Sequence, residues 1–194
     1  MTSPLPLPPI AIGFFGLGIG YLVYGGSTFF KLPKEKSEAI NKALGQWGIW
    51  MPGFMQFITG MYLLLGLTVF NAFEGAPILY MAGLAFTAYG VHWFALGWKK
   101  YVGADTTVDG FMEIGFLWIS ITGAAVFFLG GDVPVAILFV LLVFVYLFGT
   151  PASLFHNENL ERIKAFWQLV AGAWLMYLMF AAAMNFALGY NLPL

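Results

Sequence analysis

Six long apolar runs, separated by short stretches that hold nearly all the charged residues, dominate the sequence. Most of these runs match the roughly 17–25 residues that an α-helix needs to cross a bilayer core of about 30 Å. They extend over Pro9–Phe30, Gly48–Phe70, Ala76–Gly97, Gly110–Leu129, Val133–Gly149 and Phe166–Gly189. A transmembrane β-barrel would instead need runs of about ten residues with strict alternation, a pattern that does not occur. The sequence therefore predicts an all-α integral membrane protein, in which residues 1–194 form one six-helix domain.

The composition supports a lipid environment. Hydrophobic residues make up 61% of the chain and charged residues 9%, against roughly 45–50% and about 25% in soluble domains. The net charge of −1 gives no reason to expect nucleic acid as a partner. Without cysteine there are no disulfides, thiolate metal sites or cysteine nucleophiles. Metal-ligand spacings, phosphate-binding loops and nucleophile–base pairs are also missing, so we expect neither an enzyme nor a cofactor or metal site.

The basic residues predict the orientation in the membrane. All eight lie between the first and second, third and fourth, or fifth and sixth runs: Lys31, Lys34, Lys36, Lys42, Lys99, Lys100, Arg162 and Lys164. The positive-inside rule places these three connections in the cytoplasm and both termini outside, in a bacterial or archaeal cytoplasmic membrane. Because the first charged residue is Lys31, the start lacks the basic region of a cleaved signal peptide, and we expect the first span to be retained.

Small residues recur at helical spacing within the first two runs. Gly16 and Gly20 are four residues apart, and Gly53 and Gly60 share a helical face with Gln56 between them. Such steps let helix backbones approach closely, so we interpret these glycines as packing residues rather than pore-lining ones.

Five of the polar residues inside the runs are each either an interhelical hydrogen-bonding group or a contact for a solute. They are Gln56, Thr87, Tyr89, His92 and Asn185. Tyr89 and His92 share one helical face because they are three residues apart. His92 is a candidate for sensing or relaying a proton, since histidine titrates near neutral pH; the alternative is a neutral, packed histidine.

The acidic residues near the fourth run have a structural and a functional interpretation. Glu113 is the one carboxylate inside a run, a turn beyond Asp109. The dipole at a helix N-terminus would stabilise it there, and it is also a second proton-binding candidate. We expect Lys99, Lys100, Asp105 and Asp109 to form a solvated loop, and His156 to lie on a hydrated surface.

Four separated stretches resemble the signature patterns of one known family. "PPIAIGFFGLG" is similar to the N-P-A-P-L-G-L-x-G-F-G signature, although Pro8 and Ala11 depart from it. "GIWMPGFMQFITG" resembles the second-helix pattern G-I-F-x-x-G-x-x-Q-x-x-x-G. "AFTAYGVHWF" resembles A-F-T-S-Y-G-x-F-W-L, with His92 in place of an aromatic residue. "YLMFAAAMNFALGYNLP" is similar to the last helix, and the four stretches occur in the family's order. The family that the chain resembles is the acetate uptake transporter family (AceTr), the SatP/YaaH-type acetate and succinate transporters.

The resemblance implies a function and a set of site residues. It implies a ring of six subunits, each a six-helix bundle with its own pore for a small carboxylate such as acetate and possible coupling to protons. The pore constriction would be Leu17, Tyr89, and Val143 or Leu142, all near the middle of their runs. Gln56, Thr87, Asn185 and Trp93 would contact the substrate, and His92 would lie on the cytoplasmic side of the constriction. An apolar constriction of this kind excludes hydrated ions by dewetting.

The chain also departs from the family. The segment between Gln56 and Thr87 is longer than expected and lacks the family's basic loop after the second helix. The acidic residue expected near Ala182 is absent, which counts against proton coupling. Family termini are expected in the cytoplasm, whereas the lysine distribution places them outside.

The reversed orientation favours a second hypothesis. Urea and short-chain amide channels of the UreI/AmiS type are also six-span proteins, expected as hexamers with external termini. The segments "KSEAINKALG", expected here as the first loop, and "LAFTAY" resemble them. Two glutamates are expected inside the spans of those channels, and only Glu113 is available. A third hypothesis, a structural subunit of a larger membrane complex, explains the low charge but not the four stretches.

Overall fold

The chain is a bundle of helices, and the computed structural model describes its residues 9–34, 37–73 and 75–194. Pro8 of the first stretch and Lys36 of the basic set lie outside the described residues. In chain order the elements are α1 (Ile10–Phe29), α2 (Glu38–Gly48), the π-helix η1 (Ile49–Phe54), α3 (Met55–Thr68), α4 (Leu79–Val102), α5 (Asp109–Leu129), α6 (Val133–Phe155) and α7 (Glu158–Leu188). Because α2, η1 and α3 are continuous, the described residues contain six helices of membrane-spanning length and hydropathy. The all-α, six-span prediction is confirmed.

The helices extend beyond the apolar runs, so several predicted boundaries are wrong. The expected first loop "KSEAINKALG" is mostly helix α2, which Ser37 caps by accepting a hydrogen bond from the N–H of Ile40. Helix α7 begins at Glu158 rather than Phe166 because Asn157 caps it in the same way. Its 31 residues would span about 46 Å, longer than the hydrocarbon core. Charges mark where the bilayer core ends, whereas capping residues mark where a helix ends.

The second span contains a π-helical turn at its middle. Pro52 lies inside η1, where its missing N–H and its ring prevent a regular α-helical hydrogen bond. Helix α1 approaches this turn closely: a Cβ atom at Gly16 would lie 2.6 Å from the carbonyl oxygen of Met51, and one at Gly20 would lie 2.6 Å from Cγ of Pro52. These contacts agree with the packing role expected for the two glycines.

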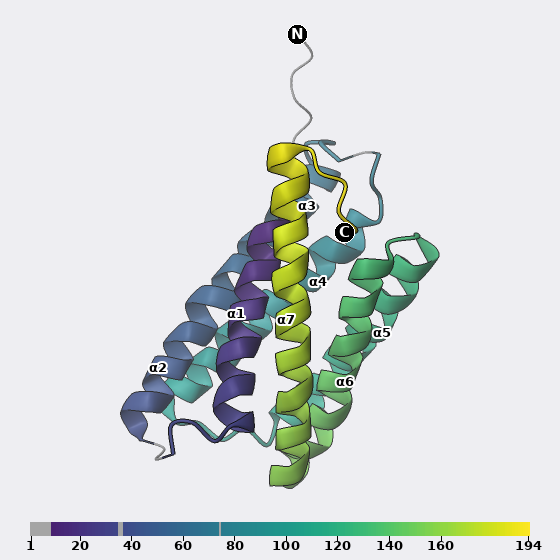
Figure 1. Ribbon diagram of the computed structural model, residues 1–194. Coiled ribbons are helices and arrows are strands. Elements are labelled where there is room, and N and C mark those ends of the chain that lie inside the picture. The colour runs from purple at the N-terminus through teal and green to yellow at the C-terminus, as the bar shows by residue number, and fades with distance from the viewer. Residues whose placement is uncertain (1–8, 35–36, 74) are drawn as a thin grey trace.

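The helices form two groups with α1 and α7 side by side at the centre (Figure 1). The second span packs against α4 on one side, and α5 and α6 form an antiparallel hairpin on the other. This hairpin packs mainly through α6 against α7, while α4 and α5 meet over a smaller area. All three connections that carry basic residues lie at one end of the bundle, which we call the lysine end. The opposite end, where α1 begins and α7 finishes, is the terminal end.

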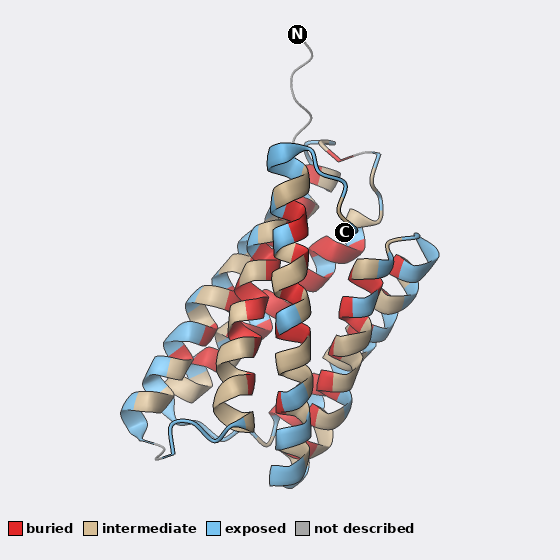
Figure 2. Cartoon of the chain, viewed as in Figure 1, coloured by how far each residue is buried: buried red, intermediate tan, exposed pale blue. Residues whose placement is uncertain are grey.

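Side chains on the outer surface of the bundle are largely apolar. Buried residues face the middle of the bundle, and exposed residues lie outward and at the two ends (Figure 2). Trp118 and Phe111 on α5, for example, are 66% and 69% exposed. An outer surface of this kind fits lipid as its solvent, because a helix satisfies its own backbone hydrogen bonds and can present apolar side chains to hydrocarbon.

Candidate functional site

The bundle encloses two hollows on one path along its axis. The larger, which we call the vestibule, opens at the lysine end and has a volume of about 350 Å³. The smaller, the inner hollow, has a volume of about 30 Å³ and lies toward the terminal end. Leu17 and Leu142 line the inner hollow, whereas Tyr21 and Tyr146, each four residues further along the same helices, line the vestibule. The two hollows are therefore about one helical turn apart.

Three of the predicted constriction residues meet at the inner hollow. Leu17 from α1, Tyr89 from α4 and Leu142 from α6 all line it, and each is at least 98% buried. Val143 does not line it and is only partly buried. Because neighbouring residues of a helix point about 100° apart, Leu142 and Val143 cannot both face the pore. Leu142 therefore lines the inner hollow and Val143 does not, so Leu142 is the alternative that we keep as the predicted constriction residue.

Gln56 is the polar group that most distinguishes the inner hollow. Its side chain comes from α3, is fully buried, and lies among aliphatic and phenylalanine side chains. Among the described residues, neither its Nε2 nor its Oε1 has a hydrogen-bond partner. An unpaired buried amide is costly, so this carboxamide is a strong candidate for contact with a solute.

A stack of rings, which we call the aromatic layer, lies between the two hollows and consists of Tyr89, Phe116, Tyr146 and His92. The Tyr89 and Tyr146 rings are nearly parallel with centroids 5.9 Å apart, and Phe116 lies 5.2 Å from Tyr89 and 4.6 Å from His92. The Tyr89 hydroxyl lies 2.9 Å from Oγ of Ser120, which donates to the carbonyl oxygen of Phe116 at 2.7 Å. Since the serine proton is used in that bond, Tyr89 is the donor to Ser120. These bonds fix the Tyr89 ring in place.

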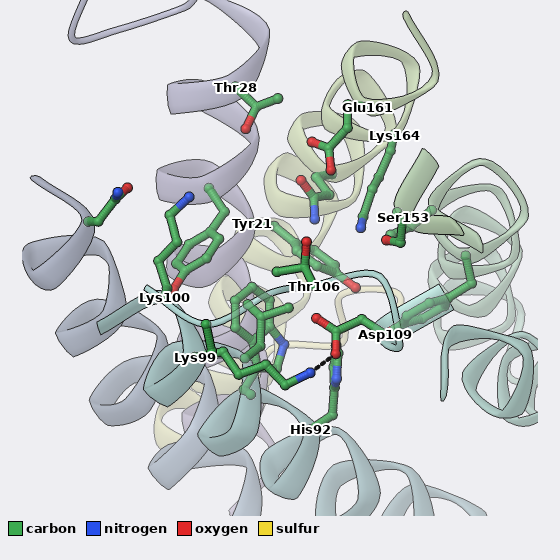
Figure 3. A pocket seen from close by; sticks show the side chains of 18 of the residues that line it. Tyr21, Thr28, His92, Lys99, Lys100, Thr106, Asp109, Ser153, Glu161 and Lys164 are labelled. Carbon is green, nitrogen blue, oxygen red and sulfur yellow. Dashed lines mark hydrogen bonds and ion pairs between the residues drawn. The ribbon is translucent and has the colours of Figure 1, made fainter. Parts of the chain in front are cut away.

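Two ion pairs anchor the start of α5 at the vestibule. Lys99 of α4 pairs with Asp109, as Figure 3 shows beside His92. Lys164 of α7 pairs with Glu113 at 2.7 Å, and Ser153 of α6 donates to the same carboxylate at 3.4 Å. Both acids are almost fully buried. The prediction that Lys99 and Asp109 lie in a solvated loop is therefore wrong, because α4 and α5 extend far enough for the two side chains to meet.

The remaining loop residues behave as expected of a hydrated surface. His156 is exposed, and its Nε2 lies 2.8 Å from the Thr107 hydroxyl. Hydrogen bonds from the side chain and the backbone N–H of Thr107 hold the pKa of the Asp105 carboxyl below its ordinary value. The exposed loop between α4 and α5 thus favours the charged form of Asp105.

The predicted substrate-binding residues do not form one group. Trp93 lines the vestibule, and its indole N–H has no partner among the described residues. Thr87 lines neither hollow, because its hydroxyl packs against Gly60 where α3 and α4 cross. The Asn185 carboxamide binds the backbone of Leu192 through both of its polar atoms. Of the predicted set, Gln56 alone lines the inner hollow, and Asn185 instead ties the C-terminal segment to α7.

Sequence reasoning missed the partners that complete this site. The sequence did not predict a role in the site for Tyr21, Ser120 or Tyr146. It also did not predict that Lys99 and Lys164 pair with acidic residues of α5. One signal was available: Tyr21 and Tyr146 follow Leu17 and Leu142 by four residues, so each shares a helical face with a constriction residue.

Comparison with known proteins gives a likeness of fold. The sequence matches no protein-family model and no curated protein. Among solved structures, the bacterial acetate channel SatP is similar to this chain with a TM-score of 0.76, over 96% of this chain and 97% of that chain, at 18% sequence identity. The resemblance noted from the four sequence stretches is therefore confirmed at the level of architecture: this chain has the fold of the SatP acetate channel.

Proposed function

We propose that this protein is a membrane transporter or channel for small monocarboxylates, with acetate or acetic acid as the first choice and succinate as a further one. The observation that carries the proposal is the meeting of Leu17, Tyr89 and Leu142 around one hollow, with the unpaired Gln56 carboxamide among them. The likeness to an acetate channel supports it. The protein would act without covalent chemistry, as a path for a solute rather than as an enzyme.

The proposed path runs from the vestibule through the aromatic layer to the inner hollow. A hydrated ion loses its water at an apolar constriction and stalls there. A small amphiphile with a methyl group can contact Leu17 and Leu142 while its polar end reaches Gln56. The constriction would open by movement of rings in the aromatic layer, because Tyr89 lines the inner hollow and its ring is nearly parallel to that of Tyr146, with centroids 5.9 Å apart.

We further propose that transport is linked to protons, with His92 and Glu113 as the titrating candidates at the vestibule side. His92 lies between the vestibule and Phe116, whereas Glu113 is held by Lys164. In the membrane, the lysine end would face the cytoplasm by the positive-inside rule, and the subunits would assemble as a homohexamer like the family that the sequence resembles.

A channel for urea or short-chain amides is the second candidate. An uncharged hollow with one free carboxamide suits an amide solute as well as an acid, because amides pair with each other through one N–H and one C=O. The lysine distribution, which places the termini outside, also favours this candidate.

The test is uptake of radiolabelled acetate and urea, measured side by side in proteoliposomes with and without an inward proton gradient. The protein-free liposomes must carry the same gradient, because acetic acid crosses lipid unaided. We expect acetate uptake above this control, stimulated by the gradient. Urea uptake without acetate uptake would reassign the protein as an amide channel.

A further inference from the structure

We propose that residues 190–194, which we call the strap, close the terminal-end mouth of the path and must lift before a solute can pass. The strap follows α7 and is bound back onto that helix by side chains of α7 itself. This inference rests on the path described under the proposed function, and it concerns access to the inner hollow rather than the identity of the solute.

The strap runs back along α7 because the chain reverses at Gly189. The φ angle of Gly189 is +72°, a left-handed conformation that suits glycine. Its N–H donates to the carbonyl oxygen of Asn185, and the N–H of Tyr190 donates to that of Met184. Hydrogen bonds of this kind end a helix and direct the next residues back along it. Figure 1 shows the C-terminal segment folding back from the end of α7 beside that helix.

Two side chains of α7 bind the strap through its backbone. The Asn185 carboxamide accepts a hydrogen bond from the N–H of Leu192 at 2.8 Å and donates one to its carbonyl oxygen at 2.9 Å. The Tyr177 hydroxyl donates to the carbonyl oxygen of Pro193 at 2.9 Å. Because Tyr177 precedes Asn185 by about two helical turns, both side chains lie on one side of α7 and can hold one segment along it.

The contacts of Tyr177 place the strap at the terminal end of the inner hollow. The Tyr177 ring lies against Trp174, with centroids 5.0 Å apart. The indole N–H of Trp174 donates to the carbonyl oxygen of Pro134, in the first turn of α6, at 2.9 Å. Val135, the next residue of α6, lines the inner hollow. The strap therefore lies where α7 meets the start of α6, beside the lining of that hollow.

The strap directs its apolar side chains toward the bundle. Leu192 and Leu194 are partly buried, whereas Asn191 and Pro193 are exposed, an alternation typical of an extended segment. Leu194 packs against the hydrophobic core to which the apolar lining of the inner hollow belongs. The inner hollow would then be separated from water by the aromatic layer on one side and by the strap on the other. A terminal segment held by a few such contacts opens at a lower free energy than the helices unfold.

The experiment measures how fast a thiol in the inner hollow reacts with a reagent that stays in water. The chain has no cysteine, so Ala82→Cys introduces a single thiol, in the first turn of α4 and in the lining of the hollow. We expect a charged methanethiosulfonate to modify it on the order of tenfold faster when Asn185→Leu removes two hydrogen bonds to the strap. A chain that ends at Gly189, and so lacks the strap, should also react faster. Asn191→Leu changes an exposed side chain of the strap and should leave the rate as it is.

Two further measurements make the outcome decisive. The thiol of Thr106→Cys, on an exposed residue of the vestibule, should react at the same rate with and without the strap. Among variants that elute as the wild type does, an Ala82→Cys thiol that reacts equally fast with the strap intact, in Asn185→Leu and in the shortened chain would overturn the inference. Labelled acetate flux separates this result from the proposed function. Strap-dependent modification without acetate flux above the protein-free control would support the strap and reject the carboxylate function.

Discussion

Replacing Lys164 with methionine should destabilise the bundle strongly, because it removes the partner of a buried carboxylate. The Glu113 side chain is 2% exposed, and among the described residues its hydrogen-bond partners are the Lys164 ammonium at 2.7 Å and the Ser153 hydroxyl at 3.4 Å. A Cβ atom at Gly149 would lie 2.7 Å from Oε2, so α6 also passes close to the carboxylate.

The magnitude follows from the cost of a buried charge that has lost its partner, which is about 3–5 kcal/mol. For a chain of this length, that loss corresponds to a fall in melting temperature on the order of 10 °C. Methionine keeps the length and the apolar part of the lysine side chain, so lost packing should contribute little. The double variant Glu113→Gln with Lys164→Met removes both charges and should recover most of the loss.

The assay is thermal unfolding in detergent, followed by tryptophan fluorescence and by elution of the remaining folded protein. Lys42→Met is the matched control, because Lys42 pairs with Glu38 on the surface, where the side chains are 45% and 81% exposed. An exposed pair contributes about 0–1 kcal/mol, so this variant should melt close to the wild type. Equal melting of Lys164→Met and Lys42→Met, or a double variant no better than the single one, would refute the reasoning.

Four further predictions concern the aromatic layer, the close helix contacts and the C-terminal segment. Tyr89→Ala should raise solute leak through the constriction, and unchanged leak in this variant would show that Tyr89 is not part of the gate. Tyr89→Phe loses only the hydrogen bond to Ser120, so it should cost about 1 kcal/mol in stability and keep the pore closed. If His92 senses protons, wild-type uptake of acetamide, a solute that does not titrate, should change between about pH 5 and 8, and this pH dependence should disappear in His92→Phe. Wild-type uptake that does not depend on pH would leave His92 with a packing role only. Gly90→Ala would place a Cβ 2.5 Å from a backbone nitrogen of α3, so it should lower the stability by about 1–3 kcal/mol in the same thermal assay. Its control is Gly115→Ala, whose Cβ would have nothing within 4 Å and which should be neutral or stabilising. Asn185→Leu should release the C-terminal segment to proteolysis without lowering acetate uptake, and a large loss of uptake would show that Asn185 contacts the solute after all.

The amino-acid sequence by itself determined the class of fold. Long uncharged runs can be stable in lipid only as helices, because each helix satisfies its own backbone hydrogen bonds. This constraint is local, so the number of spans and their approximate centres follow from the order of residues alone. The helix ends did not follow, because they depend on capping residues such as Ser37 and Asn157, which lie among charges outside the apolar runs.

The site could be predicted only in part. The family resemblance implied Leu17, Gln56, Tyr89 and Leu142 as site residues, and these four residues line one hollow. The sequence of α6 leaves open whether Leu142 or Val143 points into that hollow. The packing of α6 against the other helices decides it. Thr87 and Asn185 were selected because they are polar within apolar runs. The Thr87 hydroxyl instead packs against a glycine of α3 and has no hydrogen-bond partner among the described residues. Asn185 binds a backbone segment beyond α7. Both outcomes depend on how the chain turns back on itself.

Only the tertiary structure decided the electrostatics of the site. Glu113 and Lys164 are 51 residues apart, and Lys99 and Asp109 are joined across a turn that a count of charges treats as solvated loop. Nothing in one helix reveals whether a carboxylate will find an ammonium, because the pairing requires two or three helices to meet at one depth. The same packing leaves Gln56 without a partner among the described residues. A sequence shows which polar groups a membrane bundle carries, whereas the packing of its helices decides which of them remain unpaired.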